Sequence, residues 1–251
     1  MKAGFLICSV FTAFLLVSCA QMERSDLVLP GSQHSQTFEK TVTKTVGCKY
    51  LLFLPAGYGE KKQHWPMIMF LHGSGERGSD LEKLKKCPLP RIVENQKSFP
   101  FIVVSPQCPE GEFWMEQTEV LINLLDDIAA RYDVDTERIY LTGLSMGGHG
   151  TWSLAIAEPE RFAAVAPVCG ENRPYMAYRL KDVPVWAFHG AKDEIVPLKK
   201  SEEMVNAIRE SGGNAKLTVY PDAGHNAWTQ TYNNQELYDW FLEHRKSDKK
   251  K

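Results

Sequence analysis

The segment Gly143-Leu144-Ser145-Met146-Gly147 places a serine between two glycines, each two positions away. The apolar run 138–141 before it predicts a strand, and the residues after it predict a helix that ends before Pro159. A serine at such a tight strand-to-helix turn is typical of a nucleophile, because flanking glycines let the backbone pack closely around it. The positive end of the following helix would help an anion form there. A plain strand-to-helix turn is the less favoured interpretation.

An acid and a base for this serine follow later in the chain, each just past a predicted strand. Asp193 comes first and His225 second. A serine hydroxyl is a weak nucleophile at neutral pH, so it needs a base within hydrogen-bond reach, and the base needs an orienting partner. We therefore predict that His225 takes the proton of Ser145 and that Asp193 orients the imidazole. Glu194 and Asp222 are rival acids, but a short side chain just past a turn favours Asp193.

The glycine-rich loop His72-Gly73-Ser74-Gly75 follows a continuous apolar run that predicts a buried strand. A serine hydrolase needs two backbone N–H groups that face the oxygen on which negative charge develops. We expect one from Met146, the residue after the nucleophile, and the second from Ser74, with Gly73 as the alternative. His72 is interpreted as an anchor for the loop rather than as a catalytic group.

Two further histidines lie close in sequence to these residues. His189 ends a predicted strand, and we interpret it as a buried residue that ties down the following loop. His149 lies just inside the helix after Ser145, and we expect it to pack there or to form part of a pocket wall. Neither is assigned to the reaction.

Apolar runs that alternate with helical patterns organise the chain around these residues. The expected strands are 46–54, 67–71, 101–104, 138–141, 162–168, 183–188 and 216–220, and the expected helices are 120–132, a helix ending at 157, 198–209 and 233–245. This alternation predicts an α/β fold, with a mainly parallel sheet covered by helices on both faces. Loops at the carboxyl ends of parallel strands meet at one edge, so the candidate residues should converge there.

The motifs together resemble the α/β-hydrolase superfamily. They are His72 to Gly78, Gly143 to Gly148, His189 to Asp193 and Gly224-His225-Asn226. Within it, the chain is similar to bacterial esterases related to dienelactone hydrolase, polyhydroxybutyrate depolymerase and feruloyl or acetyl-xylan esterases, often labelled phospholipase/carboxylesterase or predicted peptidase. The likeness runs from about Val46 to Arg245. It implies the α/β-hydrolase fold and a serine, acid and histidine in that order, with no metal or organic cofactor.

The resemblance also indicates where the substrate would bind. Trp114 and Trp228 stand where family members carry aromatic residues around the cleft, and each is either a pocket residue or a packing residue. Cys169-Gly170-Glu171 follows a strand end and is expected to border the cleft. No long insertion separates the strands, so we expect an open cleft rather than a large lid.

Three functions compete on this evidence. The first is a serine carboxylic-ester hydrolase acting through an acyl-enzyme on short-chain or hydroxycinnamoyl esters, free or carried on polysaccharide. The second is a serine peptidase of the prolyl-oligopeptidase kind, although those enzymes usually carry a gating domain that this chain has no room for. The third is an inactive hydrolase domain used for binding, whose usual mark is a lost serine or histidine. The first is preferred.

The start of the chain is expected to be a leader. A basic residue and a short apolar run predict a signal peptide over residues 1–18, and Leu16-Val17-Ser18-Cys19 resembles the lipobox of bacterial lipoproteins, with Cys19 as the lipidated residue. An ordinary secretory signal is the alternative. We expect a tether over 19–37, a catalytic domain over 38–246 and a disordered tail over 247–251. The expected location is the cell envelope, at the outer membrane or cell surface.

Composition limits the partners. The 251 residues carry a formal net charge of -2, which gives no reason to expect nucleic acid, and membrane attachment is expected only through the N-terminal lipid. Oligomeric state stays open.

An exported protein sits where disulfides persist, so Cys48, Cys87, Cys108 and Cys169 could pair. Three full pairings are open; a Cys87–Cys108 bridge is our first guess, and unpaired buried thiols are the alternative. No cysteine or histidine spacing predicts a metal site.

Overall fold

A computed structural model describes residue 33 and the ranges 35–60 and 62–250. Its contacts divide the chain into two units, Met1–Lys44 and Thr45–Lys251, and the helices and strands described below all belong to the second. The predicted signal peptide, Cys19 and most of the predicted tether lie outside the described residues. Among the helices in the described ranges, none has the length and apolar character needed to cross a membrane.

A seven-stranded sheet forms the centre of the second unit. The strands are β1 (Tyr50–Phe53), β2 (Trp65–Leu71), β3 (Ile102–Pro106), β4 (Val134–Leu144), β5 (Ala164–Val168), β6 (Val185–Gly190) and β7 (Ala215–Tyr220). Their order across the sheet is β1-β3-β2-β4-β5-β6-β7. Only β1, at one edge, is antiparallel to its neighbour, and the other described pairs are parallel. The prediction of a mainly parallel sheet is confirmed.

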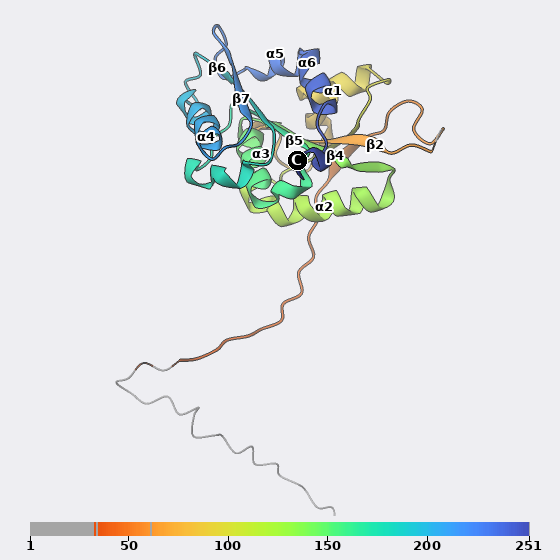
Figure 1. Cartoon of the computed structure of the whole chain (residues 1–251). Coiled ribbons are helices and arrows are strands. Elements are labelled where there is room, and N and C mark those ends of the chain that lie inside the picture. Colours follow the sequence, from red (N-terminus) through yellow and green to blue (C-terminus); the bar gives the residue numbers. More distant parts are fainter. Residues whose placement is uncertain (1–32, 34, 61, 251) are drawn as a thin grey trace, which may run out of the picture. The chain divides into compact units, whose positions relative to one another are not determined.

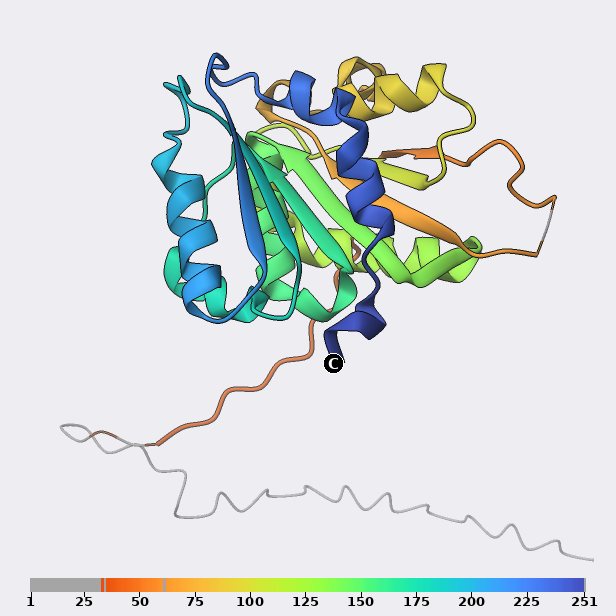
Figure 2. The ribbon, with the colours of Figure 1, turned by 45° about the horizontal axis from the view of Figure 1, so that its top comes forward.

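Helices cover both faces of this sheet (Figures 1 and 2). They are α1 (Pro88–Asn95), α2 (Thr118–Arg131), α3 (Met146–Ala157), α4 (Lys199–Glu210), α5 (Trp228–Asn233) and α6 (Gln235–Leu242), with the short 3₁₀ helices η2 (Ser74–Glu76), η3 (Leu81–Lys86), η4 (Trp114–Gln117), η5 (Pro159–Arg161), η6 (Pro174–Leu180) and η7 (Lys246–Lys250). Side chains from α2, α3 and α4 pack on one face, and side chains from α1, α5 and α6 pack on the other.

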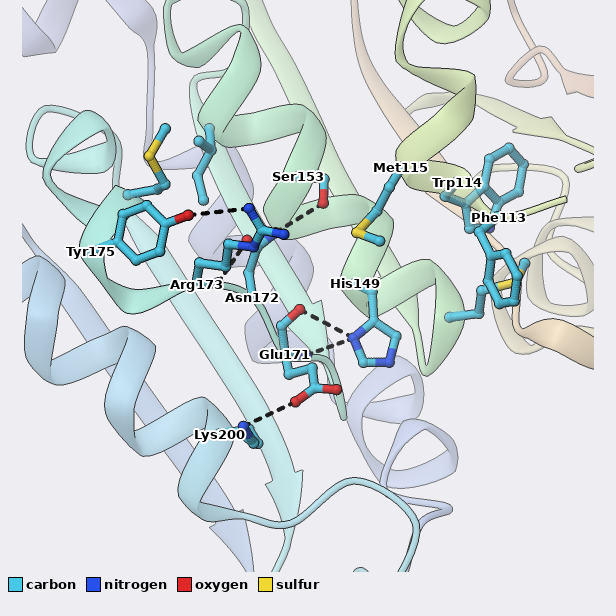
Figure 3. Close-up of a pocket in the computed structure, with 13 residues that line it drawn as sticks. Phe113, Trp114, Met115, His149, Ser153, Glu171, Asn172, Arg173, Tyr175 and Lys200 are labelled. Atoms are coloured by element: carbon cyan, nitrogen blue, oxygen red, sulfur yellow. Dashed lines mark hydrogen bonds and ion pairs between the residues drawn. The ribbon is translucent and has the colours of Figure 1, made fainter.

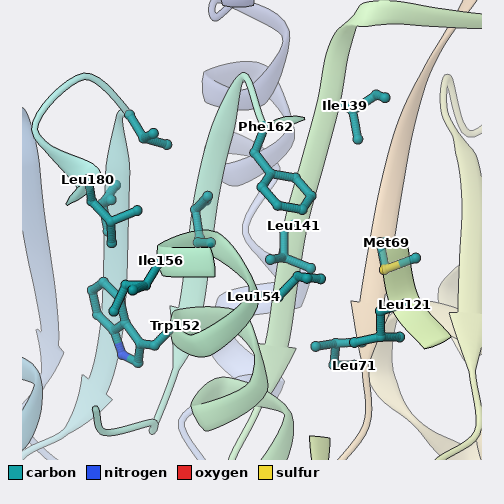
Figure 4. Close-up of a cluster of buried hydrophobic side chains, with 14 of the residues drawn as sticks. Met69, Leu71, Leu121, Ile139, Leu141, Trp152, Leu154, Ile156, Phe162 and Leu180 are labelled. Carbon is teal, nitrogen blue, oxygen red and sulfur yellow. The ribbon is translucent and has the colours of Figure 1, made fainter. Parts of the chain in front are cut away.

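Strand β2 shows how the sequence builds two cores at once. Its side chains alternate between the faces, so Met67, Met69 and Leu71 join the α2–α3–α4 core while Ile68 and Phe70 join the opposite core. Figure 4 shows the first of these cores, with α3 lying over the strands. A strand buried on both faces reads as a continuous apolar run, which is why the sequence predicts it well.

Several elements differ from the sequence predictions. Strand β1 is shorter than the predicted 46–54, and α1 was not predicted. The expected last helix over 233–245 is interrupted, because the Asn234 side chain accepts the Glu236 N–H and starts α6 as a separate helix. Of the expected tail over 247–251, residues 247–250 belong to η7, where the Asp248 carboxylate accepts the Arg245 N–H.

The structure has no disulfide among the four described cysteines, and the guess that Cys87 pairs with Cys108 is wrong. Cys87 packs in the α1–α5–α6 core, whereas Cys108 packs in the α2–α3–α4 core on the opposite face of the sheet. A disulfide needs its two Cα atoms within about 7 Å, and a sheet between two side chains prevents this. Cys169 lies with Cys87 on the α1–α5–α6 side.

Candidate active site

Ser145 lies at the turn from β4 into α3 with φ 52° and ψ -117°. A positive φ is strained for a residue with a side chain and is held here by the packing around the turn. A Cβ on Gly143 would lie 2.5 Å from the Gly147 carbonyl oxygen, and a Cβ on Gly147 would lie 1.9 Å from the Leu71 carbonyl oxygen. The two glycines are therefore required for β4 and α3 to approach β2 this closely, with the serine partly exposed at the strand end.

The structure brings Ser145, His225 and Asp193 together from three separate strand ends. The His225 Nε2 atom lies 2.8 Å from the Ser145 Oγ atom. The His225 Nδ1 atom lies 2.8 Å from the Asp193 Oδ2 atom. The hydroxyl, the imidazole and the carboxylate thus form one hydrogen-bonded chain, the geometry that activates a serine nucleophile.

The Asp193 carboxylate is buried and anchored at both oxygens. Its Oδ1 atom accepts the backbone N–H groups of Ile195 and Val196, each at 2.9 Å, which leaves Oδ2 for His225. Burial by itself raises the pKa of Asp193, but the hydrogen bonds from His225, Val196 and Ile195 outweigh it and hold the pKa below its usual value. Asp193 is therefore ionised at neutral pH and can stabilise a protonated imidazole.

The rival acids lie elsewhere. Glu194 is exposed. Asp222 is exposed too, and its carboxylate pairs with Lys192 at 2.9 Å. The described contacts of His225 with a carboxylate involve Asp193 alone.

A second imidazole, that of the fully buried His189, also contacts Asp193. His189 Nε2 is 2.8 Å from the Val196 carbonyl oxygen and 3.2 Å from Asp193 Oδ2, while Nδ1 is 2.8 Å from the Ser201 hydroxyl. Because a carbonyl oxygen only accepts, Nε2 carries the proton that it donates to Val196. His189 thus fixes the loop that carries Asp193, as expected, and also contacts the carboxylate itself, which the sequence did not reveal.

The Cys169 Sγ, a His189 ring nitrogen and an Asp193 oxygen lie within 4.8 Å of one another, a set that could ligate a metal. Both His189 nitrogens and the Asp193 oxygens already have protein partners, and the Cys169 thiol lies 3.2 Å from the His225 carbonyl oxygen. Burial raises the pKa of the Cys169 thiol to about 12, which keeps it protonated. The protein contacts of these three residues around Ser145, His225 and Asp193 therefore explain why they lie close together.

The loop after β2 is held by His72, whose side chain is fully buried. Its Nε2 atom accepts the Cys108 N–H at 3.0 Å, so the neutral ring carries its proton on Nδ1, next to the Gly73 carbonyl oxygen. The Trp114 indole N–H donates to the His72 carbonyl at 2.9 Å. Burial disfavours the imidazolium and lowers the pKa of His72 to about 4. His72 is thus the loop anchor that the sequence suggests.

This histidine makes stability depend on pH. Its pKa is about 4 in the folded protein and 6.5 as the reference value, so the unfolded chain binds more protons between these limits. The contribution of His72 to stability is therefore complete above pH 6.5 and is lost as the pH falls towards 4. We expect His72→Gln to reduce the pH slope of the unfolding free energy in this range by about one proton.

Urea unfolding at a series of pH values measures this slope. The exposed His64 gives the control, since His64→Gln should leave the slope as it is in the parent protein. An unchanged slope in His72→Gln would show that His72 titrates normally in the fold.

The predicted oxyanion donors lie at the ends of two elements. Met146 is the first residue of α3, so its N–H has no acceptor within the helix. Ser74 begins η2 after Gly73, in the loop that His72 anchors. A Cβ on Gly73 would lie 2.9 Å from a Leu144 methyl carbon, so the loop backbone passes close to the residue before the nucleophile.

A cavity of about 830 Å³ opens beside Met146. Figure 3 shows Phe113 and Met115, near the start of η4, on one side and Tyr175, near the start of η6, on the other. Polar residues complete the lining: Lys200 pairs with Glu171 at 3.4 Å. This volume is within the range of about 300–1,000 Å³ typical of small-molecule sites. The sequence did not predict the walls formed by Phe113, Met115 and Tyr175.

The other predicted pocket residues divide between lining and packing. Trp114 lines the cavity, but its side chain is buried and supports the His72 backbone. Trp228 is absent from the described lining and instead packs edge-on against the His225 ring, with ring centres 5.2 Å apart. His149 lines the cavity as expected, and its Nδ1 atom accepts the Glu171 N–H at 2.9 Å. Cys169, expected to border the cleft, is buried and absent from the described lining.

Comparisons with known proteins agree with this geometry. Residues 111–249 match the model of the dienelactone hydrolase family. A putative carboxymethylenebutenolidase of Yersinia pestis is 33% identical over 136 residues, covering 46% of this chain and 51% of that relative. A probable feruloyl esterase C of Aspergillus terreus is 24% identical over 187 residues, covering 73% of this chain and 68% of that relative. The chain matches about half the length of the first of these relatives.

A solved structure is also similar over most of the fold. The crystal structure of a thermostable esterase superimposes with a TM-score of 0.68 at 32% sequence identity, covering 78% of this chain and 59% of that one. The α/β-hydrolase fold expected from the motifs is thereby confirmed.

Proposed function

Because the chain belongs to the dienelactone hydrolase family, we propose that it is a serine hydrolase that cleaves carboxylic esters through an acyl-enzyme. The observation that carries the proposal is the unbroken hydrogen-bonded chain from the Ser145 hydroxyl through His225 to the Asp193 carboxylate. The esterases among its relatives support the choice of an ester as substrate.

In the first half of the reaction, the Ser145 oxygen attacks the ester carbonyl carbon while His225 Nε2 takes the hydroxyl proton. The negative charge on the carbonyl oxygen is stabilised by the N–H groups of Met146 and Ser74. Asp193 stabilises the imidazolium through Nδ1. When the tetrahedral intermediate collapses, the bond to the alcohol oxygen breaks, and His225 returns the proton to that oxygen.

In the second half, water attacks the acyl carbon of the acyl-enzyme while His225 takes a proton from it. Collapse of the second intermediate breaks the bond to the Ser145 oxygen, which recovers its proton from His225. The products are a carboxylic acid and an alcohol, and the enzyme returns to its starting state. These steps need no group beyond the residues named and water.

For the substrate, we propose an ester with a short or aromatic acyl group, including hydroxycinnamoyl esters on polysaccharide. The cavity beside Met146 combines apolar walls at Phe113, Met115 and Tyr175 with polar groups, which suits a ring that carries hydroxyl substituents. The side chains of Met115 and Tyr175 are more than half exposed, so the cavity opens to solvent and leaves room for a bulky alcohol portion.

Two tyrosines of η6 test this assignment. Tyr175 and Tyr178 are both exposed, but only Tyr175 is among the described residues that line the cavity. We expect Tyr175→Ala to lower kcat/KM for a feruloyl ester about 3- to 10-fold, the loss of one aromatic contact, with a smaller effect on an acetyl ester. Tyr178→Ala should match the parent on both. Equal losses on both esters, or equal effects of the two variants, would place the acyl group elsewhere.

The experiment that tests the function as a whole is hydrolysis of a chromogenic ester panel with acetyl, butyryl, octanoyl and feruloyl groups. We expect cleavage, with the acyl preference identifying the substrate class. A folded protein that cleaves prolyl peptide substrates and none of these esters would be a peptidase. Inertness to both panels would favour a binding role.

We further propose that the protein is exported and held at the cell envelope by a lipid on Cys19. The support is the sequence alone, through the apolar leader and the lipobox-like Leu16-Val17-Ser18-Cys19. A tethered enzyme outside the cell suits an ester carried on a polymer. Mass spectrometry of the N-terminal peptide decides between a diacylglyceryl cysteine and an unmodified mature end.

A further inference from the structure

Cys48 lies two residues before β1, and Cys108 lies two residues after β3, its antiparallel partner strand. The antiparallel register runs from Phe53 opposite Val103 to Tyr50 opposite Pro106. Two positions further along, the same register sets Cys48 opposite Cys108. The pairing does continue that far, because the Gln107 N–H donates to the Lys49 carbonyl oxygen at 2.8 Å.

The backbone hydrogen bonds indicate which type of opposed pair Cys48 and Cys108 form in the antiparallel ladder. The bond from the Gln107 N–H to the Lys49 carbonyl is one of the two bonds that mark a hydrogen-bonded pair, so we assign Lys49 and Gln107 to that type. Hydrogen-bonded and non-hydrogen-bonded pairs alternate along an antiparallel ladder, so Cys48 and Cys108 form a non-hydrogen-bonded pair. The backbone of Cys108 agrees, since its N–H donates to His72 and its carbonyl accepts from Gly78 rather than from β1.

This type of pair brings two side chains closest together. Its Cα atoms are typically about 4.5 Å apart, which lies inside the range of about 4.4–6.8 Å that a disulfide requires. Both thiols are on the same side of the sheet: Cys108 belongs to the α2–α3–α4 core, and Cys48 packs against that core. Cys87 and Cys169 belong to the opposite core.

We propose that Cys48 and Cys108 are joined by a disulfide when the chain folds in contact with a small-molecule or protein disulfide as oxidant. The thiolate of one cysteine attacks a sulfur of the oxidant and releases one thiol. The second cysteine then attacks the resulting mixed disulfide and releases the other thiol. The two cysteines together lose two electrons and two protons, and the oxidant is reduced to two thiols.

The bond should form during folding rather than afterwards. Burial raises the pKa of the Cys48 thiol to about 11 and that of the Cys108 thiol to about 12, and the Cys48 thiol itself adds to the rise for Cys108. Thiolates are the reactive species, so both groups react slowly once the core has closed around them. In the unfolded chain they are exposed and ionise more readily.

A disulfide between Cys48 and Cys108 would restrain the backbone that supports the active site. It closes β1, an edge strand, onto the end of β3, next to the Cys108 N–H that holds His72 Nε2. His72 in turn anchors the loop that carries Ser74. Cross-linking residues this far apart in sequence removes conformational freedom from the unfolded chain, so the oxidised protein should melt about 5–15 °C higher than the reduced protein.

To test this, the purified chain is reduced, denatured and then refolded under two conditions. One buffer contains oxidised and reduced glutathione, and the other contains dithiothreitol. Peptides are then mapped without reduction, and melting temperatures are recorded. We expect a peptide pair that joins Cys48 to Cys108 after the glutathione refold only. Cys48→Ala should abolish the difference in melting temperature between the two refolds, and Cys87→Ala should retain it.

The mapping uses the unaltered chain, so it decides the matter even if a variant fails to fold. Free Cys48 and Cys108 after the glutathione refold, or a bridge from either of them to Cys87 or Cys169, would overturn the proposal. The proposal is independent of the esterase assignment, since neither thiol takes part in the reaction.

Discussion

The Ser145→Ala variant is expected to lose ester hydrolysis by about 10⁴- to 10⁶-fold in kcat, because no other group at the turn can form the acyl-enzyme. The loss should fall on turnover, since the cavity beside Met146 is lined by other residues and stays intact. The fold should be retained, because alanine meets the same backbone demand as serine at φ 52°. Initial rates with a chromogenic ester and a melting curve of each protein measure the two expectations.

A serine-to-alanine substitution away from the site controls for a general effect of the change. Ser98 is exposed in the turn between α1 and β3, and Ser98→Ala should hydrolyse the ester at the parent rate. Activity in Ser145→Ala within tenfold of the parent would mean that another group carries the reaction.

The second large effect is expected for Asp193→Asn, at about 10⁴-fold in kcat. Asparagine has one acceptor oxygen, so it cannot accept both from the loop N–H groups of Ile195 and Val196 and from His225. If the asparagine NH₂ group faces His225, the imidazole accepts its hydrogen bond at Nδ1 and therefore carries its own proton on Nε2. That tautomer cannot take the proton of Ser145, which Nε2 must accept.

The neighbouring Glu194 is a close control for this prediction. Its side chain is exposed, so Glu194→Gln should leave kcat within about twofold of the parent. A greater loss of kcat in Glu194→Gln than in Asp193→Asn would mean that Glu194, and not Asp193, is the acid that orients His225. Activity in Asp193→Asn equal to that of the parent would remove the carboxylate from the mechanism.

The sequence could predict that Ser145, Asp193 and His225 come together because each is tied to a strand end by local chemistry. The glycines around Ser145 are explained by the close approach of Leu71 and by a tight turn, and such requirements are visible in a single segment. Asp193 and His225 each follow a strand of the parallel part of the sheet, so the fold itself brings them to one edge.

Contacts that depend on packing between distant segments were not visible in this way. The cavity walls at Phe113, Met115 and Tyr175 come from two turns whose side chains are exposed, a pattern that resembles ordinary surface. The contact of His189 with Asp193, at 3.2 Å, depends on how one loop folds back on its own strand. Neither hydrophobic periodicity nor a short motif carries this information.

The cysteines illustrate the same limit. Cys87 and Cys108 were guessed as a pair because they flank one strand-bearing segment, but they pack on opposite faces of the sheet. The register of β1 against β3 is what sets Cys48 opposite Cys108, and register depends on long-range strand pairing.

Labelling with an alkyl fluorophosphonate, followed by peptide mapping and an ester assay, tests the central claim most directly. Such a reagent forms a stable phosphonyl ester with a serine that a neighbouring base activates. Our account predicts one label on Ser145, loss of ester hydrolysis in proportion to labelling, and no label in Ser145→Ala. Full labelling of Ser145 with hydrolysis undiminished, or a label on another serine that abolishes activity, would contradict it.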